Sequence, residues 1–356
     1  MSRLTSLLSR GRARQTARRA PATRPSPRGA PLVARIEELE AEVRHLRAVA
    51  AGAAPDGERV AGPIFVGGTG RSGTWVLGRM IGRHPDIVTA RTELRFHAAG
   101  GGFRKVLAGE ESPADYAARV RRRRFDRVPA AGSGERGISL VATREQLEQA
   151  TQRLEALADH DITAALRAFT HTLVDPYALG HAGRTWVDTT PENIAVTDSL
   201  HQVFPTAKAI HTVRDGRDVA ASIVTQPWGP TTFDEALDVW ATRLRAAHHG
   251  TRHADPQRLL TIRLEELIHL HRDREFDRIV RILDLTDPQP LRTYFDQAMN
   301  ADRAHVGRWR HDVPPAQRDA IDQHYRHLYD QLTSEGITCL PTDPDTIDQI
   351  HHASTA

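Results

Sequence analysis

The chain has 356 residues, of which 39% are hydrophobic, enough to build a sizeable core in one large domain or two modest ones. Its formal net charge is +3, but residues 1–31 hold eight arginines and no acidic residue. The remainder is therefore net negative, which argues against a nucleic-acid enzyme. Cys339 is the only cysteine, which excludes a disulfide framework or a cysteine metal site within one chain.

The N-terminal part divides into three segments. Residues 1–31 are rich in Arg, Pro, Ser and Ala, a composition that predicts a disordered tail. Residues 32–50 carry apolar residues at heptad spacing, which predicts a short coiled-coil-like helix. This helix would either support a homo-oligomer or pack on its own domain, and residues 51–62 read as a linker.

Targeting signals are weak in this sequence. No apolar run approaches the roughly 20 residues that a membrane span needs. The N-terminus lacks the apolar region of a signal peptide, although its Arg- and Ser-rich composition is also compatible with a transit peptide. We therefore expect a cytoplasmic protein.

A catalytic domain is expected over residues 63–340, followed by a C-terminal tail at 341–356. Short apolar runs predict strands near 63–67, 86–90, 185–188, 207–213 and 258–262. Helical periodicity appears over 74–83, 144–158, 161–178, 193–203, 217–225, 232–250, 274–284 and 314–333. This alternation predicts an α/β fold of three layers, α/β/α, with a central parallel sheet. Ligands bind such sheets beyond the carboxyl ends of their strands.

A glycine-rich loop follows the first strand, where residues 67–74 read GGTGRSGT and the next helix begins. Backbone N–H groups in such a loop, together with the helix N-terminus, form an anion site. Arg71 adds a full charge, and the hydroxyls of Thr69, Ser72 and Thr74 add donors. The loop therefore predicts a phosphate site, with a purely structural turn as the alternative.

This loop differs from a standard Walker A motif. The position of the phosphate-binding lysine is Thr74, and the position of the Mg²⁺-binding hydroxyl is Trp75. Both departures argue against a P-loop-type small-molecule kinase, which remains an alternative.

A second anion site is indicated by a strand that ends at Arg214. A helix follows near Gly216 and carries Ser222 about two turns on, so that both side chains can converge on one phosphate. A structural ion pair of Arg214 is the alternative. Between the two motifs, residues 99–136 look like an insertion with four consecutive arginines, either a lid over an anionic ligand or a solvated charged helix.

These motifs resemble the sulfotransferases that use 3′-phosphoadenosine 5′-phosphosulfate (PAPS), in particular bacterial proteins like the carbohydrate and tyrosylprotein branches. Residues 70–74 are similar to that family's 5′-phosphosulfate loop, and Arg214 and Ser222 have the spacing of its 3′-phosphate motif. Residues 261–267 and 306–310 are similar to two later segments, in the right order. The resemblance implies a P-loop-like fold, PAPS as sulfuryl donor, 3′,5′-ADP (PAP) as product, and no metal.

The resemblance also assigns the site residues. It implies that the nucleotide is bound by Gly70, Arg71, Ser72, Gly73, Thr74, Trp75, Arg214, Ser222, Gly307, Arg308 and Trp309. Glu93 would be the catalytic base that takes the proton of the acceptor hydroxyl, and Arg71 would stabilise the transition-state charge. A surface ion pair with Arg91 or Arg95 is the alternative role of Glu93.

Three further residues are candidates for the acceptor site. His97 is a second candidate base, and Asp188 would contact the acceptor unless it caps the following helix. Thr189 stands where the family usually has lysine, so Arg71 or an arginine of the insertion would carry more of the charge.

The sequence therefore predicts a PAPS-dependent O-sulfotransferase. Its acceptor would be a hydroxyl of a carbohydrate or of a glycosylated or lipid natural product, with PAP released. The alternatives are the kinase and a catalytically inactive, PAP-binding oligomeric scaffold.

Overall fold

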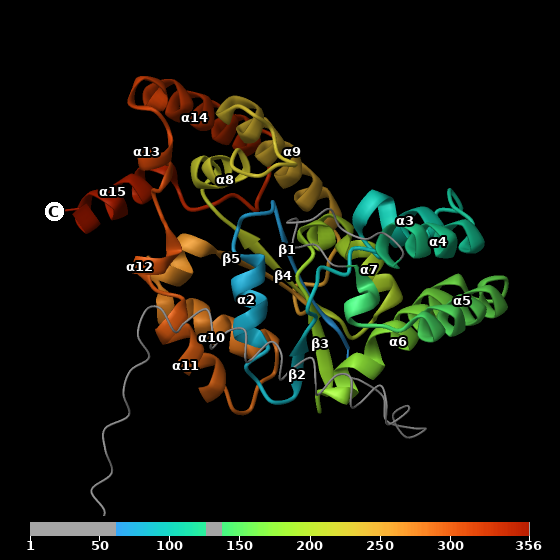
Figure 1. Cartoon of the computed structure of the whole chain (residues 1–356). Helices are drawn as coiled ribbons and strands as arrows, with labels where there is room; N and C mark the ends of the chain where they lie inside the picture. The colour runs from blue at the N-terminus through green and yellow to red at the C-terminus, as the bar shows by residue number, and fades with distance from the viewer. Residues whose placement is uncertain (1–61, 126–136, 356) are drawn as a thin grey trace, which may run out of the picture. The chain divides into compact units, whose positions relative to one another are not determined.

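A five-stranded, fully parallel sheet forms the centre of the computed structural model, which describes residues 62–125 and 137–355 (Figure 1). The strand order is β2-β3-β1-β4-β5. The strands are β1 (Ile64–Gly68), β2 (Ile87–Thr89), β3 (Thr185–Asp188), β4 (Lys208–Val213) and β5 (Leu259–Arg263). Parallel sheets occur almost only where helices cover both faces.

Helices occupy most of the chain between and after the strands. The first half carries α2 (Thr74–Ile81), α3 (Gly102–Leu107), α4 (Pro113–Val120), α5 (Arg144–Ala158), α6 (Ile162–Gly180), the 3-10 helix η4 (Pro191–Val196) and α7 (Thr197–Val203). The second half carries α8 (Gly216–Ile223), α9 (Phe233–Thr251), α10 (Arg272–Ile282), α11 (Gln289–Ala298), α12 (Ala301–Ala304), α13 (Trp309–Asp312), α14 (Arg318–Ser334) and α15 (Pro344–Thr355).

Alternate residues of β1 belong to two different cores, because side chains along a strand point to opposite faces. Ile64 and Val66 pack with residues of α2, α10 and α11 on one face. Phe65 packs with α6, α7 and the α3–α5 region on the other. The predicted three-layer α/β/α fold with a central parallel sheet is confirmed.

A third core lies among α8, α9, α13 and α14, which share the upper part of Figure 1. Trp240 of α9 and Trp309 of α13 are its largest side chains, and both are buried. This core fixes α8 against α9 at the end of β4, and it thereby sets the position of Ser222.

The carboxyl ends of all five strands lie along one edge, because the strands are parallel. The segments that leave β1, β3, β4 and β5 start at this edge, at residues 69, 189, 214 and 264. The central strand β1 is flanked by β3 and β4, so the chain departs to both sides of it. Such a switch point is the usual ligand site of an open parallel sheet.

Several sequence expectations differ from the structure in detail. The helix expected over 193–203 is divided into η4 and α7, and the inserted region contains α3 and α4. The segment 341–356, which the sequence analysis separates as a tail, contains α15. The predicted basic tail, heptad helix and linker, at 1–31, 32–50 and 51–61, lie outside the described residues.

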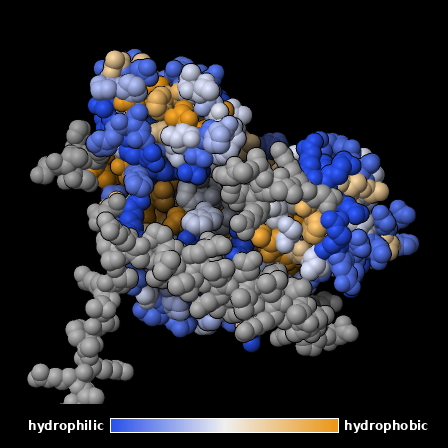
Figure 2. Space-filling model, viewed as in Figure 1, coloured by the Kyte–Doolittle hydropathy of each residue, from blue (hydrophilic) through white to orange (hydrophobic). Residues whose placement is uncertain are grey.

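The surface in Figure 2 is mostly hydrophilic over α4 and α5, and hydrophobic residues gather in a hollow left of centre, near α12, α13 and α2. Over residues 62–125 and 137–355, no helix combines the length and hydropathy that crossing a bilayer requires.

Candidate active site

The glycine-rich loop joins β1 to α2 with three residues in left-handed backbone conformations. Gly70, Arg71 and Gly73 have φ values of 79°, 56° and 91°. Glycine adopts this conformation freely, but it is uncommon for a residue with a side chain such as Arg71. Left-handed residues within a loop turn successive N–H groups toward one concavity, which suits an anion.

Ser72 anchors this loop to the neighbouring strand. Its side chain is fully buried, and its Oγ lies 3.1 Å from Oγ1 of Thr212 in β4. A Cβ atom on Gly68 would lie 2.4 Å from the same Oγ, so only glycine fits there. The Ser72 hydroxyl therefore positions the loop, and Ser72 does not line the cavity.

Arg71 contacts both Ser222 and Arg214 in the structure. Arg71 donates from Nε to Ser222 Oγ at 2.9 Å, and Arg214 donates from Nη1 to the Arg71 carbonyl oxygen at 3.2 Å. Burial and the charges of Arg214 and Arg308 lower the pKa of Arg71. The Nε of Arg214 is buried and has no hydrogen-bond partner within the described part of the chain.

Asp218 of α8 holds the loop that precedes α13. It accepts hydrogen bonds from the backbone N–H groups of Gly307 at 2.9 Å and Trp309 at 3.1 Å. Burial raises the pKa of Asp218, although the charge of Arg214 opposes this. Asp218 thus fixes the backbone at Gly307 and Trp309. Of the three predicted residues Gly307, Arg308 and Trp309, only Arg308 lines the cavity.

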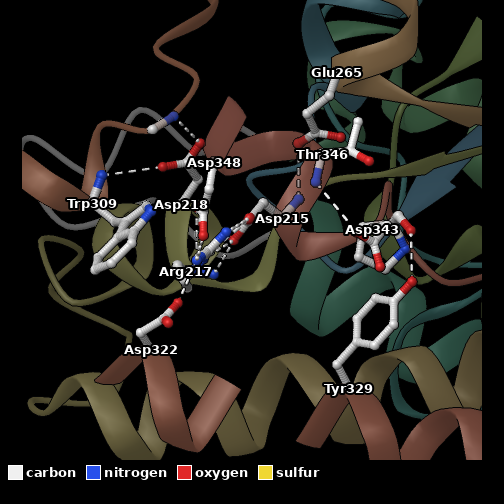
Figure 3. A network of polar contacts seen from close by, with 12 residues as sticks. Asp215, Arg217, Asp218, Glu265, Trp309, Asp322, Tyr329, Asp343, Thr346 and Asp348 are labelled. Atoms are coloured by element: carbon white, nitrogen blue, oxygen red, sulfur yellow. Dashed lines mark hydrogen bonds and ion pairs between the residues drawn. The ribbon is translucent and has the colours of Figure 1, made fainter. Parts of the chain in front are cut away.

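Arg217, the residue before Asp218, organises a buried network behind the site (Figure 3). Its guanidinium pairs with Asp215 at 2.7 Å, with Asp348 of α15 at 3.1 Å, and with Asp322 of α14. The indole ring of Trp309 lies 4.8 Å from its carbon Cζ. This network ties α8, α14, α15 and the loop before α13 together.

Glu93 lines the cavity in a row of alternating charges. Its Oε2 lies 2.9 Å from Nε of Arg95, and Nη2 of Arg95 lies 3.4 Å from Oε1 of Glu192. The side chain of Glu93 is 33% exposed, so an acceptor can reach it. Glu192 is a second carboxylate at this end of the cavity, and the sequence analysis did not single it out.

His97 and Asp188 lie behind this row and away from the cavity. Both side chains are fully buried, and their Nε2 and Oδ2 atoms are 3.2 Å apart. Asp188 also accepts a hydrogen bond of 2.9 Å from the backbone N–H of Leu94. Burial would raise the pKa of Asp188, but hydrogen bonds from His97, Leu94 and Asn193 outweigh it and lower this pKa. Asp188 therefore holds the segment next to Glu93, and neither Asp188 nor His97 lines the cavity.

Thr189 is also buried, and it packs against α2. A Cβ atom on Gly78 would lie only 2.2 Å from Cγ2 of Thr189, so the two elements approach closely. Thr189 does not line the cavity, contrary to its assignment to the acceptor site.

The glycine loop and the segments around it enclose one cavity of about 710 Å³. Among the predicted residues it is lined by Gly70, Arg71, Gly73, Thr74, Trp75, Glu93, Arg214, Ser222 and Arg308. One end is bounded by Trp75, Leu264, Ile268 and Met299, and it is mostly apolar. The other is bounded by Glu93, Arg95, Glu192 and Arg243. Trp228 also lines the cavity.

The sequence analysis missed Arg243, Asp218 and Glu192. None of the three directly follows a glycine-rich loop. Each lies in a segment whose sequence pattern predicts a helix or a turn and gives no sign of a binding site. Arg121, Arg122 and Arg123 of the insertion are exposed, and they do not line the cavity. No group of three or more metal-ligating side chains occurs in the described ranges.

Comparison with known proteins identifies the family. Residues 63–289 match the model of the sulfotransferase family. The chain is 23% identical over 229 residues to a protein-tyrosine sulfotransferase of Drosophila melanogaster. The match covers 62% of this chain and 38% of the fly protein, so the chain spans well under half of that relative.

Two solved structures are similar to the chain. The sulfotransferase domain of the olefin synthase from Synechococcus PCC 7002 has a TM-score of 0.46 and 19% identity, covering 79% of this chain and 98% of the domain. The sulfotransferase domain from the curacin biosynthetic pathway has a TM-score of 0.47 and 16% identity, covering 77% and 98%.

Proposed function

This chain belongs to the sulfotransferase family, and on that premise we propose that it transfers a sulfuryl group from PAPS to an acceptor hydroxyl and releases PAP. One observation carries the proposal. Arg71, Arg214 and Ser222 join the glycine loop after β1 to the start of α8 in one cavity. The mutual repulsion of clustered guanidiniums is relieved by a bound anion, which favours a ligand with more than one phosphate.

The residues present fit such a donor. The Nε donor of Arg214 is buried and lacks a partner among the described residues, so a bound phosphate would satisfy it. The left-handed loop offers N–H groups for the 5′-phosphosulfate, and Arg214 and Ser222 offer donors for the 3′-phosphate. Arg308 closes over the nucleotide, and Trp75 bounds the apolar end, which suits a base.

When bound, PAPS supplies a sulfuryl group attached to a phosphate leaving group. Glu93 accepts the proton of the acceptor hydroxyl, whose oxygen forms a bond to sulfur as the sulfur–oxygen bond to the 5′-phosphate breaks. Arg71 and the loop amides stabilise the negative charge that remains on that phosphate oxygen. Positioning and fixed charge supply most of the acceleration, as in phosphoryl transfer.

The acceptor end of the cavity supports a polyhydroxylated acceptor. Trp228 is 57% exposed and lines the cavity, and Glu93, Arg95 and Glu192 line the same cavity with charged groups. A ligand with both an apolar face and several hydroxyls matches these surroundings. We therefore propose a carbohydrate or a glycosylated or lipid natural product as the acceptor.

A transfer assay tests this function. The purified chain is incubated with PAPS and a panel of glycans, glycosylated natural products, simple phenols and tyrosine peptides, and products are identified by mass spectrometry. Sulfation of sugar hydroxyls is expected. Sulfation of phenols or tyrosine alone would overturn the acceptor class, and PAP binding without any transfer would favour an inactive scaffold.

A further inference from the structure

Arg243 approaches the glycine loop at Thr69, two residues before Arg71. It lies on α9, and its Nη1 donates a hydrogen bond of 2.7 Å to the carbonyl oxygen of Thr69. A Cβ atom on Gly70 would lie 2.9 Å from the same nitrogen. The guanidinium therefore abuts the loop backbone directly and also lines the cavity.

The charge of Arg243 is only partly compensated. Burial and the positive charge of Arg95 lower its pKa, and the negative charge of Glu192 opposes them. An arginine remains protonated under all ordinary conditions, and its contact with Thr69 uses one of five N–H donors. A half-buried cation held against an anion-binding loop is well suited to an anionic group of the ligand.

The position of Arg243 indicates which anionic group of the ligand it contacts. Arg71 contacts both Ser222 and Arg214, and the nucleotide phosphates are expected beside these residues. Arg243 contacts Thr69, two residues earlier in the loop, and lies beside Glu192 and the row that leads to Glu93. The group that lies between the loop and the proposed base is the group that is transferred.

We propose that Arg243 is a catalytic residue that contacts the oxygens of the transferred sulfuryl group, an inference that rests on the function proposed above. The acceptor oxygen gains its bond to sulfur, the bond from sulfur to the phosphate oxygen breaks, and Glu93 takes the proton. Arg243 takes no proton in this step. It stabilises the negative charge on the sulfuryl oxygens while one bond to sulfur forms and the other breaks.

Binding of PAPS and PAP without any acceptor separates this role from a structural one. Both nucleotides contain the 5′-phosphate that the loop binds, but only PAPS carries the sulfuryl group. Arg243→Ala removes one charge-assisted contact to the sulfuryl group. The dissociation constant of PAPS should therefore rise about tenfold or more, and that of PAP by less than about threefold. Isothermal titration calorimetry measures both.

The chain offers a matched control and a rescue. Arg245 lies two positions along α9, on another face of the helix, and pairs with the exposed Glu335. Arg245→Ala should leave both affinities unchanged, and Arg243→Lys, which keeps the charge, should recover most of the PAPS affinity. If Arg243→Ala does not fold, Arg243→Gln removes the charge and keeps a donor for the Thr69 carbonyl.

The outcomes separate this inference from the function on which it rests. Selective loss of PAPS affinity supports the role of Arg243. Equal losses for PAPS and PAP would show that Arg243 only holds the loop, and no loss would remove it from the site; both overturn the inference and leave the proposed function standing. Failure of the wild-type chain to bind either nucleotide would overturn the function itself.

Discussion

Arg71 donates a hydrogen bond of 2.9 Å from Nε to the hydroxyl of Ser222, although 151 positions separate the two residues in the sequence. Arg71 belongs to the loop after β1, and Ser222 belongs to the helix after β4. Because β1 and β4 are neighbours in a parallel sheet, their carboxyl ends bring these two segments together. Two motifs that each suggest an anion therefore line one cavity.

Removing either arginine should weaken PAP binding. Arg71→Ala and Arg214→Ala each delete a charged donor, and we expect each to raise the dissociation constant of PAP about tenfold to a hundredfold. Calorimetry with purified variants measures the change. Arg184→Ala is the control, because that side chain is 80% exposed and lies outside the cavity. An unchanged PAP affinity in both site variants would contradict the two-phosphate account.

The two carboxylates at the acceptor end should differ in function. Glu93→Gln keeps the shape of the side chain but cannot accept a proton, so turnover should fall by about 10²-fold or more while PAP binding is kept. Glu192→Gln is the matched variant, because Glu192 lines the same end and shares Arg95 as a partner. It should retain most of the turnover. Full activity in Glu93→Gln, or a larger loss in Glu192→Gln, would remove Glu93 as the base.

Asp218 should hold the loop that carries Arg308. Asp218→Asn removes the charge that pairs with Arg214 and weakens the acceptors for the N–H groups of Gly307 and Trp309. We expect faster hydrogen exchange at these two amides and PAP affinity lowered about tenfold, because hydrogen bonds to a buried charge are lost. Exchange at Gly307 and Trp309 that matches the wild type would contradict this positioning role.

Glu265 should make the free energy of unfolding fall as the pH rises, the opposite of the effect of a carboxyl group with a lowered pKa. Burial raises its pKa from 4.5 to about 7, although the hydrogen bond from the Asp215 N–H and the charge of Arg214 oppose this rise. Between about pH 4.5 and pH 7 the native state keeps a proton on Glu265 that the unfolded chain has released. The contribution of Glu265 to the free energy of unfolding is therefore full below about pH 4.5 and is lost as the pH rises to about 7. The change is at most about 3 kcal/mol.

Glu265→Gln tests this directly, because the amide oxygen can still accept the hydrogen bond from the Asp215 N–H. The free energy of unfolding is measured by urea titration at pH 5, 6.5 and 8. Relative to the wild type, the variant should gain stability as the pH rises, and the exposed Glu110→Gln should not. Parallel profiles for Glu265→Gln and the wild type would show that Glu265 does not titrate in this range.

The features that the sequence predicts well are those with strong local signals. The glycine loop and the strand that ends at Arg214 follow from composition and periodicity, and each strand end is within about two residues of its predicted position. Arg71, Arg214 and Ser222 were found because their spacing within short segments already limits where they can lie. The family resemblance added Glu93, which its own neighbours alone would have assigned to an ion pair with Arg95, a contact that the structure also contains.

Residues that depend on tertiary packing could not be found in this way. Arg243 reaches the loop only because α9 packs beside β1 and η4, and nothing in its local pattern separates it from Arg245. Asp188 and His97 have residue types suited to catalysis, but their burial depends on side chains more than 90 positions away. Sequence patterns identify the chemistry of such groups and leave open whether they face a ligand or the core.

The most direct test of the whole account is a thermal-shift titration of the wild-type chain with PAP, beside 5′-ADP and ATP with Mg²⁺. A ligand at about 100 times its dissociation constant adds roughly 2.7 kcal/mol of stability, which is readily measured. We expect stabilisation by PAP and little or none by the other two, because only PAP carries both the 5′-phosphate and the 3′-phosphate that we propose are bound near Arg71 and Arg214. Stabilisation by ATP with Mg²⁺ alone would contradict it and favour a kinase.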